Sequence, residues 1–323
     1  MNRSLAINIG LVAAIAAAML LSLIAGKVWI PLDAWVHADP RWPIIAELRL
    51  PRTVLAAMVG AGLGLSGAAM QGYLRNPLAD PGLFGVSSGA ALGAVISLYF
   101  GYAAAPWLLP MFALTGAAIT MALLAVLVGR SGSIVVFTLA GVILSSVAGS
   151  MTALAISLAP TPFATSQIVT WLMGALTDRS WDDVHLALPL LALGCVLLGL
   201  TGRTLDALTL GESAARSMGV DPRRLQLLIV VGVALCVGAS VATAGIIGFV
   251  GLIVPHLVRP LVGNRPSAVM LPSALAGALL LLLADSLVRA IPTVSELRLG
   301  IAMSMLGGPF FLILLMRMRR RLA

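Results

Sequence analysis

Residues 5–25 read LAINIGLVAAIAAAMLLSLIA and contain no charged side chain. An apolar stretch of about 20 residues matches the thickness of the bilayer core, whereas the core of a signal peptide is shorter. No small-residue cleavage site precedes Lys27, so we expect the stretch to remain as a membrane span. The whole chain has the same character, because 60% of its 323 residues are hydrophobic and only 10% are charged.

Further apolar stretches of spanning length follow, separated by short charged or Gly- and Pro-rich loops. With the first, the predicted spans are residues 5–26, 50–73, 83–101, 107–128, 134–158, 184–202, 225–244, 247–263, 269–289 and 299–316. In lipid, every backbone polar group must be satisfied within the protein, and these stretches exceed the length of a barrel strand. We therefore predict an all-α polytopic membrane protein of about ten transmembrane helices, with residues 1–323 forming one transmembrane domain.

The basic residues predict the orientation of these helices. If the N-terminus is cytoplasmic, thirteen of the 20 Lys and Arg residues lie on the cytoplasmic side and seven lie outside. The positive-inside rule therefore predicts that both termini are cytoplasmic. A formal charge of +8 would suggest nucleic-acid binding in a soluble protein. Here the charges lie in short loops between spans, so we expect membrane lipid and no nucleic acid as a partner.

The sequence offers little support for catalysis by this chain. Cys195 and Cys236 both fall in apolar stretches, where small buried side chains are expected rather than a disulfide or a metal site. His37, His185 and His256 are widely separated, and no HExxH motif occurs, which disfavours an intramembrane metalloprotease. No GxxxxGK[ST] motif occurs either. We therefore expect no catalytic residue, metal or cofactor in this chain, and no P-loop for ATP.

Three stretches interrupt the apolar pattern. LRLPR at 48–52 lies at the outer end of the second span, and RNPLADPG at 75–82 follows that span, where two prolines forbid a continuous helix. Residues 170–176 form an apolar patch too short to span, which predicts either a half-buried helix facing an outer cavity or an interfacial tryptophan anchor. Residues 208–224 predict a short amphipathic helix that stops at Gly219 and a new helix that starts at Asp221-Pro222. This third stretch either docks a soluble partner or is an ordinary polar connector.

Several ordered motifs together resemble the FecCD family of ABC importer permeases, from Leu48 to about Leu315. The motifs are LRLPR at 48–52, GAGLGLSGAAMQGYLRNPLADPGLFGVSSGA at 60–90, LAGV at 139–142, LGESAARSMGV at 210–220, GFVGLIVPHLVR at 248–259 and LGGPFF at 306–311. The resemblance implies a permease of the bacterial inner membrane that imports a ferric siderophore, haem or cobalamin. It also implies a homodimer, two ATP-binding subunits that hold ATP and Mg²⁺, and a periplasmic binding protein.

The resemblance also implies roles for particular residues. Arg49, Arg52 and Arg289 are expected to bind glutamates of the binding protein, although arginines that merely extend to the interface are the alternative. The coupling loop, about residues 203–225, is expected to contact the ATPase through Leu210, Gly211, Glu212, Ala214, Ala215 and Gly219. The cytoplasmic gate is expected at Asn76, Leu78, Ile134 and Val135. The cavity for cargo is expected at Trp171, Met173, Gly174 and Arg298.

Two departures from the family pattern add expectations. Relatives often carry hydroxyl residues where this chain has Ile134 and Val135, which suggests a hydrophobic gate. Relatives usually carry proline at the position of Arg298, and the added charge suggests an anionic cargo.

A rival interpretation is an ion-coupled secondary transporter of a small organic or metal-chelate substrate. That class needs ionisable residues deep in the bundle. Asp285 is a candidate, but it precedes Arg289 by four residues and so favours a local ion pair.

Overall fold

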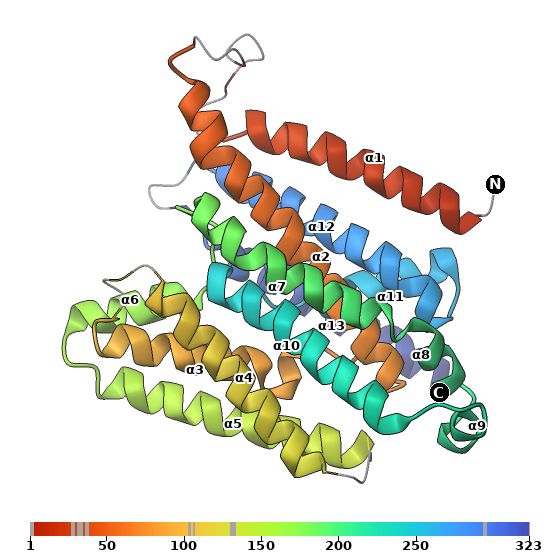
Figure 1. Ribbon diagram of the computed structural model, residues 1–323. Coiled ribbons are helices and arrows are strands. Elements are labelled where there is room, and N and C mark those ends of the chain that lie inside the picture. Colours follow the sequence, from red (N-terminus) through yellow and green to blue (C-terminus); the bar gives the residue numbers. More distant parts are fainter. Residues whose placement is uncertain are drawn as a thin grey trace.

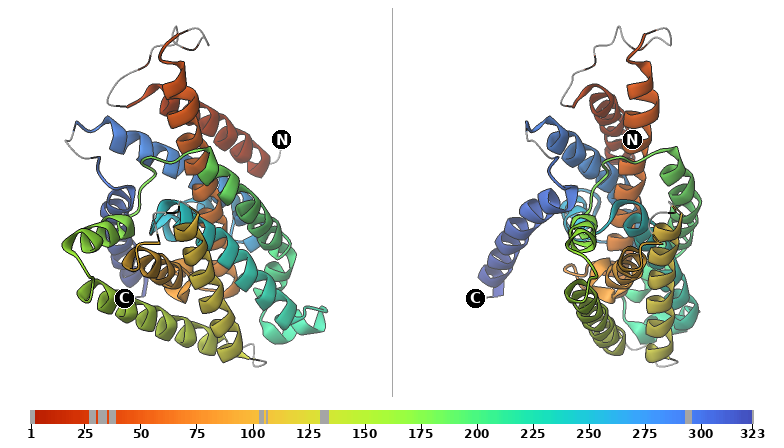
Figure 2. Two further views of the ribbon diagram at one scale, coloured as in Figure 1. Left: turned by 60° about the vertical axis from the view of Figure 1, so that its left-hand side comes forward. Right: turned by 90° about the vertical axis from the view of Figure 1, so that its left-hand side faces the viewer.

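The computed structural model describes residues 3–26, 30, 35, 39–102, 105, 107–129, 134–292 and 296–322. Within these ranges the chain is helical and forms no β-strand, which confirms the all-α prediction. Figure 1 shows the helices packed as a bundle, with α2 and α10 running through its middle. The other views in Figure 2 show α13 projecting from one side of that bundle near the C-terminus.

Each of the ten predicted apolar stretches falls on a helix. These helices are α1 (Arg3–Ile24), α2 (Leu50–Tyr73), α3 (Val86–Tyr99), α4 (Leu108–Val128), α5 (Ile134–Ser157), α7 (Trp181–Gly199), α10 (Pro222–Ala244), α11 (Val250–Val262), α12 (Pro266–Ala290) and α13 (Leu299–Leu322). In the described chain, seven helices are long and apolar enough to cross a membrane. One of them is α2 together with the π-helical turn η2 (Ile44–Arg49). The others of the ten, α3, α11 and α13, have shorter apolar segments, so the number of crossings and their orientation stay predictions.

The core of the bundle is built around α2 and α10. In its most apolar window, 78% of the residues of η2–α2 are buried, and the figure for α10 is 72%. The corresponding shares are 17% for α1 and 22% for α5. The outer helices therefore present apolar side chains to their surroundings, as expected of helices that face lipid.

Small residues let the central helices approach closely. A Cβ atom on Gly60 would lie 2.3 Å from the carbonyl oxygen of Gly277, and one on Gly64 would lie 2.2 Å from that of Ser273. Such contacts leave no room for a side chain between α2 and α12. Packing of small residues four apart is a common way for membrane helices to associate.

The three irregular stretches contain short helices. Residues 75–82 interrupt the helix as expected, and the 3₁₀ turn η3 (Pro81–Phe84) follows with Asp80 capping Gly82. The prediction for 170–176 was wrong in its bounds, because α6 (Pro162–Leu172) lies upstream and ends at Leu172. Gly174 has a φ of +66°, and Ala175 donates its backbone N–H to Ala244, so the chain after α6 leaves the helix to bond to the end of α10.

Candidate transport site

The three predicted docking arginines gather at one end of the bundle. Arg49 ends η2, Arg52 lies in the first turn of α2, and Arg289 lies in the last turn of α12. Their exposed fractions are only 8%, 8% and 7%. The guanidinium groups are therefore inside the protein in this conformation and do not extend to its surface.

These arginines bind acceptors of their own chain. Arg52 donates from Nη2 to Oδ1 of Asp285 at 2.7 Å and also pairs with Glu296. The Nε atom of Arg289 lies 3.1 Å from Oδ2 of Asp285, and its Nη2 atom donates to Ser22. The local pair between Asp285 and Arg289 is thus confirmed. Arg49 donates to the last carbonyls of α1.

A cavity of about 380 Å³ opens beside this network. Its charged lining consists of Arg41, Arg49, Arg52, Arg179, Arg289, Asp178 and Glu296. Five guanidinium groups and two carboxylates line it, and four of the guanidinium groups pair with Asp39, Asp183, Asp285 or Glu296. We call it the outer arginine cavity. At its rim, Arg41 forms an ion pair with Asp39 that lowers the pKa of the Asp39 carboxyl to about 2.

A second cavity, of about 300 Å³, adjoins the first and shares Thr177, Asp178 and Arg179 with it. We call it the tryptophan cavity. Of the residues predicted to face cargo, Trp171 and Arg298 line it. Met173 and Gly174 do not line the tryptophan cavity.

Met173 and Gly174 instead contact the backbone of two other segments of the chain. The carbonyl of Gly174 accepts the N–H of Gly300 at 3.1 Å. A Cβ atom on Gly174 would lie 2.2 Å from the carbonyl oxygen of Ile246, and one on Gly300 would lie 2.2 Å from that of Met173. The end of α6, the break after α10 and the start of α13 therefore meet at backbone contact, which only glycine permits here.

At the opposite end of the bundle, residues 202–222 adopt the predicted helix, stop and restart. After α8 (Gly202–Leu208), Gly211 has a φ of +100° and begins α9 (Glu212–Ser217). Gly219 has a φ of +84° and ends it, and Asp221 caps α10 by accepting the N–H of Arg223. Figure 1 shows α8 and α9 protruding from this end of the bundle. We call residues 209–220 the coupling segment.

Side chains of the coupling segment divide between core and surface. Ala215 is buried, with 1% exposed, and faces a small pocket, whereas Leu210 and Met218 are 66% and 63% exposed. Ala214 accepts the N–H of Met218, and Val220 donates back to Ala215. Leu210 and Met218 thus flank the short helix α9, and exposed apolar side chains of this kind can pack against a partner.

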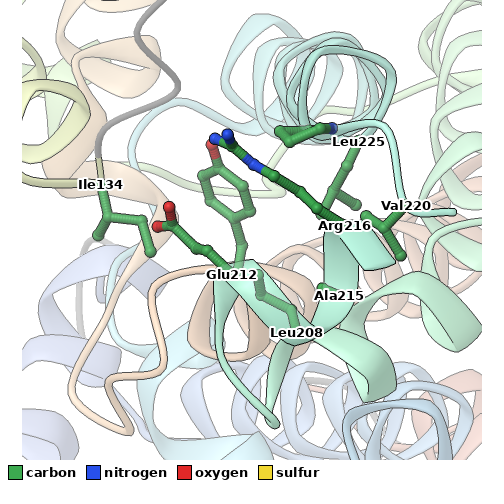
Figure 3. Close-up of a pocket in the computed structure, with 9 residues that line it drawn as sticks. Ile134, Leu208, Glu212, Ala215, Arg216, Val220 and Leu225 are labelled. Atoms are coloured by element: carbon green, nitrogen blue, oxygen red, sulfur yellow. The ribbon is translucent and has the colours of Figure 1, made fainter. Parts of the chain in front are cut away.

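The pocket beneath α9 brings one predicted gate residue to the coupling segment. Ile134, the first residue of α5, lines it with Leu208, Glu212 and Leu225. Figure 3 shows the carboxylate of Glu212 extending toward Ile134. The start of α5 and the start of α10 therefore line the same pocket as the coupling segment.

The other predicted gate residues do not line this pocket. Val135 is 66% exposed. Asn76 and Leu78 lie in the loop after α2, where Oδ1 of Asn76 accepts the N–H of Leu78 at 3.0 Å and holds the turn. The structure thus places Ile134 with the coupling segment and Asn76 with the 75–82 loop, and does not join them in one pocket.

Sequence reasoning missed several residues of these sites. Arg52 pairs with Asp285 and Glu296, which lie more than 200 residues away in the sequence. No local sequence pattern predicts such a pairing. Arg41 and Arg179 also line the outer arginine cavity. Asp285 was predicted to pair with Arg289, but its pairing with Arg52 was not. Among the described residues, which exclude His37, no cluster of three or more His, Cys, Asp or Glu could hold a metal ion.

Comparison with known proteins gives a consistent match. A sequence model of the FecCD transport family matches residues 14–317. The chain is 40% identical to the uncharacterized ABC transporter permease protein YvrB of Bacillus subtilis, over 95% of this chain and 92% of that one. It is 38% identical to the vitamin B12 import system permease protein BtuC of Klebsiella pneumoniae, over 97% and 94% of the two chains. It is 37% identical to the hemin transport system permease protein HmuU of Yersinia pestis, over 88% and 86%.

A solved structure resembles the whole fold. It is described as an inward-facing conformation of a metal-chelate type ABC transporter. The TM-score is 0.89 at 31% identity, and the match covers 96% of this chain and 99% of that one.

Proposed function

The chain belongs to the FecCD transport family, and from this membership we propose that it is the membrane-spanning permease subunit of an ABC importer for a metal chelate. The cargo class is an iron siderophore, haem or cobalamin, since similar proteins are named for vitamin B12 and hemin. The observation that carries the proposal is the match of 96% of the chain to a metal-chelate type ABC transporter at a TM-score of 0.89.

The proposed assembly contains two copies of this chain, two ATP-binding subunits and a periplasmic binding protein. The ATP-binding subunits hold ATP and Mg²⁺ and hydrolyse the nucleotide, so this chain is not itself an enzyme. Ten helices cross the bacterial inner membrane, and both termini are cytoplasmic, in keeping with the excess of basic residues on that side. Cargo passes between the two copies.

The proposed energy input is at the coupling segment. Leu210 and Met218 offer apolar surface to a groove of the ATPase, and Glu212 adds a charge. Because α9 shares a pocket with the first residues of α5 and α10, a push on α9 is transmitted to both helix ends.

Helix α10 can carry this movement to the other end of the bundle. Leu225 near its start lines the pocket beneath α9, and Ala244 at its end lines the tryptophan cavity. The intact α-helix between them is 72% buried in its most apolar window, so it moves as a rigid element. Closure of the ATPase therefore changes the cargo cavity, which is what alternating access requires.

The proposed docking site for the binding protein is the outer arginine cavity. Arg49, Arg52 and Arg289 suit carboxylates because a guanidinium group binds them through two parallel hydrogen bonds. Glu296 already pairs with Arg52, so an incoming glutamate takes its place there.

The test is transport by the reconstituted complex. Vesicles containing this chain, its ATP-binding subunits and the cargo-loaded binding protein should take up cobalamin or haem when ATP is supplied to the ATPase side. Vesicles without the ATP-binding subunits should take up none. Uptake driven by a proton gradient in vesicles that contain this chain alone would contradict the proposal and favour a secondary transporter.

A further inference from the structure

The tryptophan cavity contains a cation that its neighbours leave uncompensated. Arg298 is half-buried and lines the cavity. Within the described part of the chain, no carboxylate lies within ion-pair distance of its guanidinium group. A half-buried charge that lacks a partner raises the free energy of the empty site.

The acidic residues near Arg298 either pair with another arginine or face solvent. Glu296, two residues before Arg298, pairs with Arg52 in the outer arginine cavity. Asp183 lies 3.4 Å from Arg179, the other arginine of the tryptophan cavity. Asp178 also lines the cavity, but its side chain is exposed to solvent. Of the charged residues that line the cavity, Arg298 is therefore the one that is half-buried and has no ion-pair partner in the described part of the chain.

The backbone places a further partial positive charge next to Arg298. Arg298 lies directly before α13, and its carbonyl accepts the N–H groups of Ile301 and Ala302 in the first turn of that helix. The N-terminus of an α-helix carries a partial positive charge, which favours anions and disfavours cations. A guanidinium group placed there is electrostatically unfavourable until an anion joins it.

The rest of the lining suits a particular kind of anion. Gln167 and Thr170 supply polar groups, and Trp171 supplies an aromatic wall. A cavity of about 300 Å³ with a few polar groups on an apolar wall is typical of a small-molecule site. A carboxylate would pair with Arg298 while an apolar part of the same ligand contacts Trp171.

On the basis of the proposed function, we infer that this importer carries an anionic, carboxylate-bearing metal chelate, and that Arg298 in the tryptophan cavity binds its carboxylate. A neutral chelate gains nothing from Arg298.

The probes are ferric citrate, which is an anionic carboxylate chelate, and a neutral ferric trihydroxamate. Equilibrium binding of each probe, labelled with radioactive iron, is measured on the full chain in detergent. The wild type should bind ferric citrate saturably and more tightly than the trihydroxamate. Arg298→Gln should weaken ferric citrate binding about tenfold and reduce its salt dependence, because an ionic contact is screened by salt. Trihydroxamate binding should not change.

Arg265→Gln is the matched control, because Arg265 is an exposed arginine at the start of α12 and lines neither the tryptophan cavity nor the outer arginine cavity. It should leave ferric citrate binding within twofold of the wild type. Equal binding by wild type and Arg298→Gln, tighter binding of the neutral probe, or no saturable binding of ferric citrate would each overturn the inference.

Failure of the proposed function is separable from these outcomes. It would appear as vesicles whose complete complex takes up neither probe, haem nor cobalamin with ATP. The binding measurement needs neither ATP nor the partner subunits, so it decides the role of Arg298 in either case. Elution of the variants at the wild-type position in gel filtration shows that they are folded.

Discussion

The two ends of the bundle present opposite kinds of surface. At the end with the outer arginine cavity, charged side chains are buried and paired with carboxylates of the same chain. At the end with the coupling segment, Leu210 and Met218 are exposed and contact little of their own chain. A partner at the first end must exchange one ion pair for another, whereas a partner at the second end gains new apolar burial. Charge exchange suits reversible docking, and apolar burial suits a lasting subunit contact.

The largest effect is expected from Asp285→Asn. Asp285 is fully buried and compensates both Arg52 and Arg289, so its loss leaves Arg289 without a carboxylate partner and Arg52 with Glu296 alone. Removal of one partner of a buried ion pair costs about 3–5 kcal/mol. Thermal unfolding in detergent should show a large fall in Tm or a chain that does not fold. The control is Asp39→Asn, which breaks the half-exposed pair with Arg41 and should change Tm little. Equal effects of the two variants would show that the buried network does not stabilise the outer end.

The next effect is expected at the glycine that ends α9. Gly219→Val forces a β-branched side chain into a φ of +84°, which costs about 1–2 kcal/mol and reshapes the coupling segment. Uptake per ATP hydrolysed should fall about tenfold, a ratio that corresponds to about 1.4 kcal/mol. Binding-protein docking at the other end should stay intact.

Gly263→Val is the matched control for this backbone effect. Gly263 has a φ of +98°, lies between α11 and α12, and like Gly219 has open space around it. The control should lose similar stability without loss of coupling. Uncoupling by both variants would mean that general strain, rather than the coupling segment, is responsible.

A moderate effect is expected from the exposed leucines. Leu210→Ala should weaken binding of the ATP-binding subunit about tenfold, because burial of a leucine side chain contributes about 1.5–3 kcal/mol. Leu48→Ala changes a leucine that is also exposed, 60% against 66%, but lies at the opposite end of the chain's bundle. Titration of the ATP-binding subunit against each variant should show weaker binding for Leu210→Ala alone. Equal affinities would contradict the assignment of the coupling segment.

The smallest effect concerns pH. The pKa of Asp39 is about 2, below its value in an unfolded chain, because Arg41 stabilises the carboxylate. A carboxyl group with a lowered pKa stabilises the fold above its unfolded pKa and loses that contribution as the pH falls through about 2. The Tm difference between wild type and Asp39→Asn should therefore be constant from pH 5 to pH 8. A difference that varied within that range would show that the pair titrates there.

Local sequence features predicted the parts of this molecule that depend on local structure. Apolar length placed helices at all ten predicted stretches, and Gly219 with Asp221-Pro222 predicted the stop and restart around α10. The spacing of Asp285 and Arg289 predicted their ion pair.

Local sequence features could not predict contacts between segments that are far apart in the chain. Glu296 and Asp285 converge on Arg52 only because α2, α12 and the start of α13 meet. The end of α6 was misplaced because the backbone of residues 173–175 bonds to α10 and α13, which nothing near residue 170 reveals. Arg298 was singled out for its charge, but its lack of a partner depends on where Glu296 points.

In the proposed mechanism, force applied at the coupling segment changes the tryptophan cavity through α10. The most direct test labels Thr170→Cys, a residue of that cavity, in a chain whose Cys195 and Cys236 are replaced by alanine. With the ATP-binding subunits present, addition of ATP should change the rate at which a membrane-impermeant thiol reagent modifies residue 170 from outside. Gly219→Val should abolish that change. A labelling rate that is identical with and without ATP in the complete complex would contradict the account.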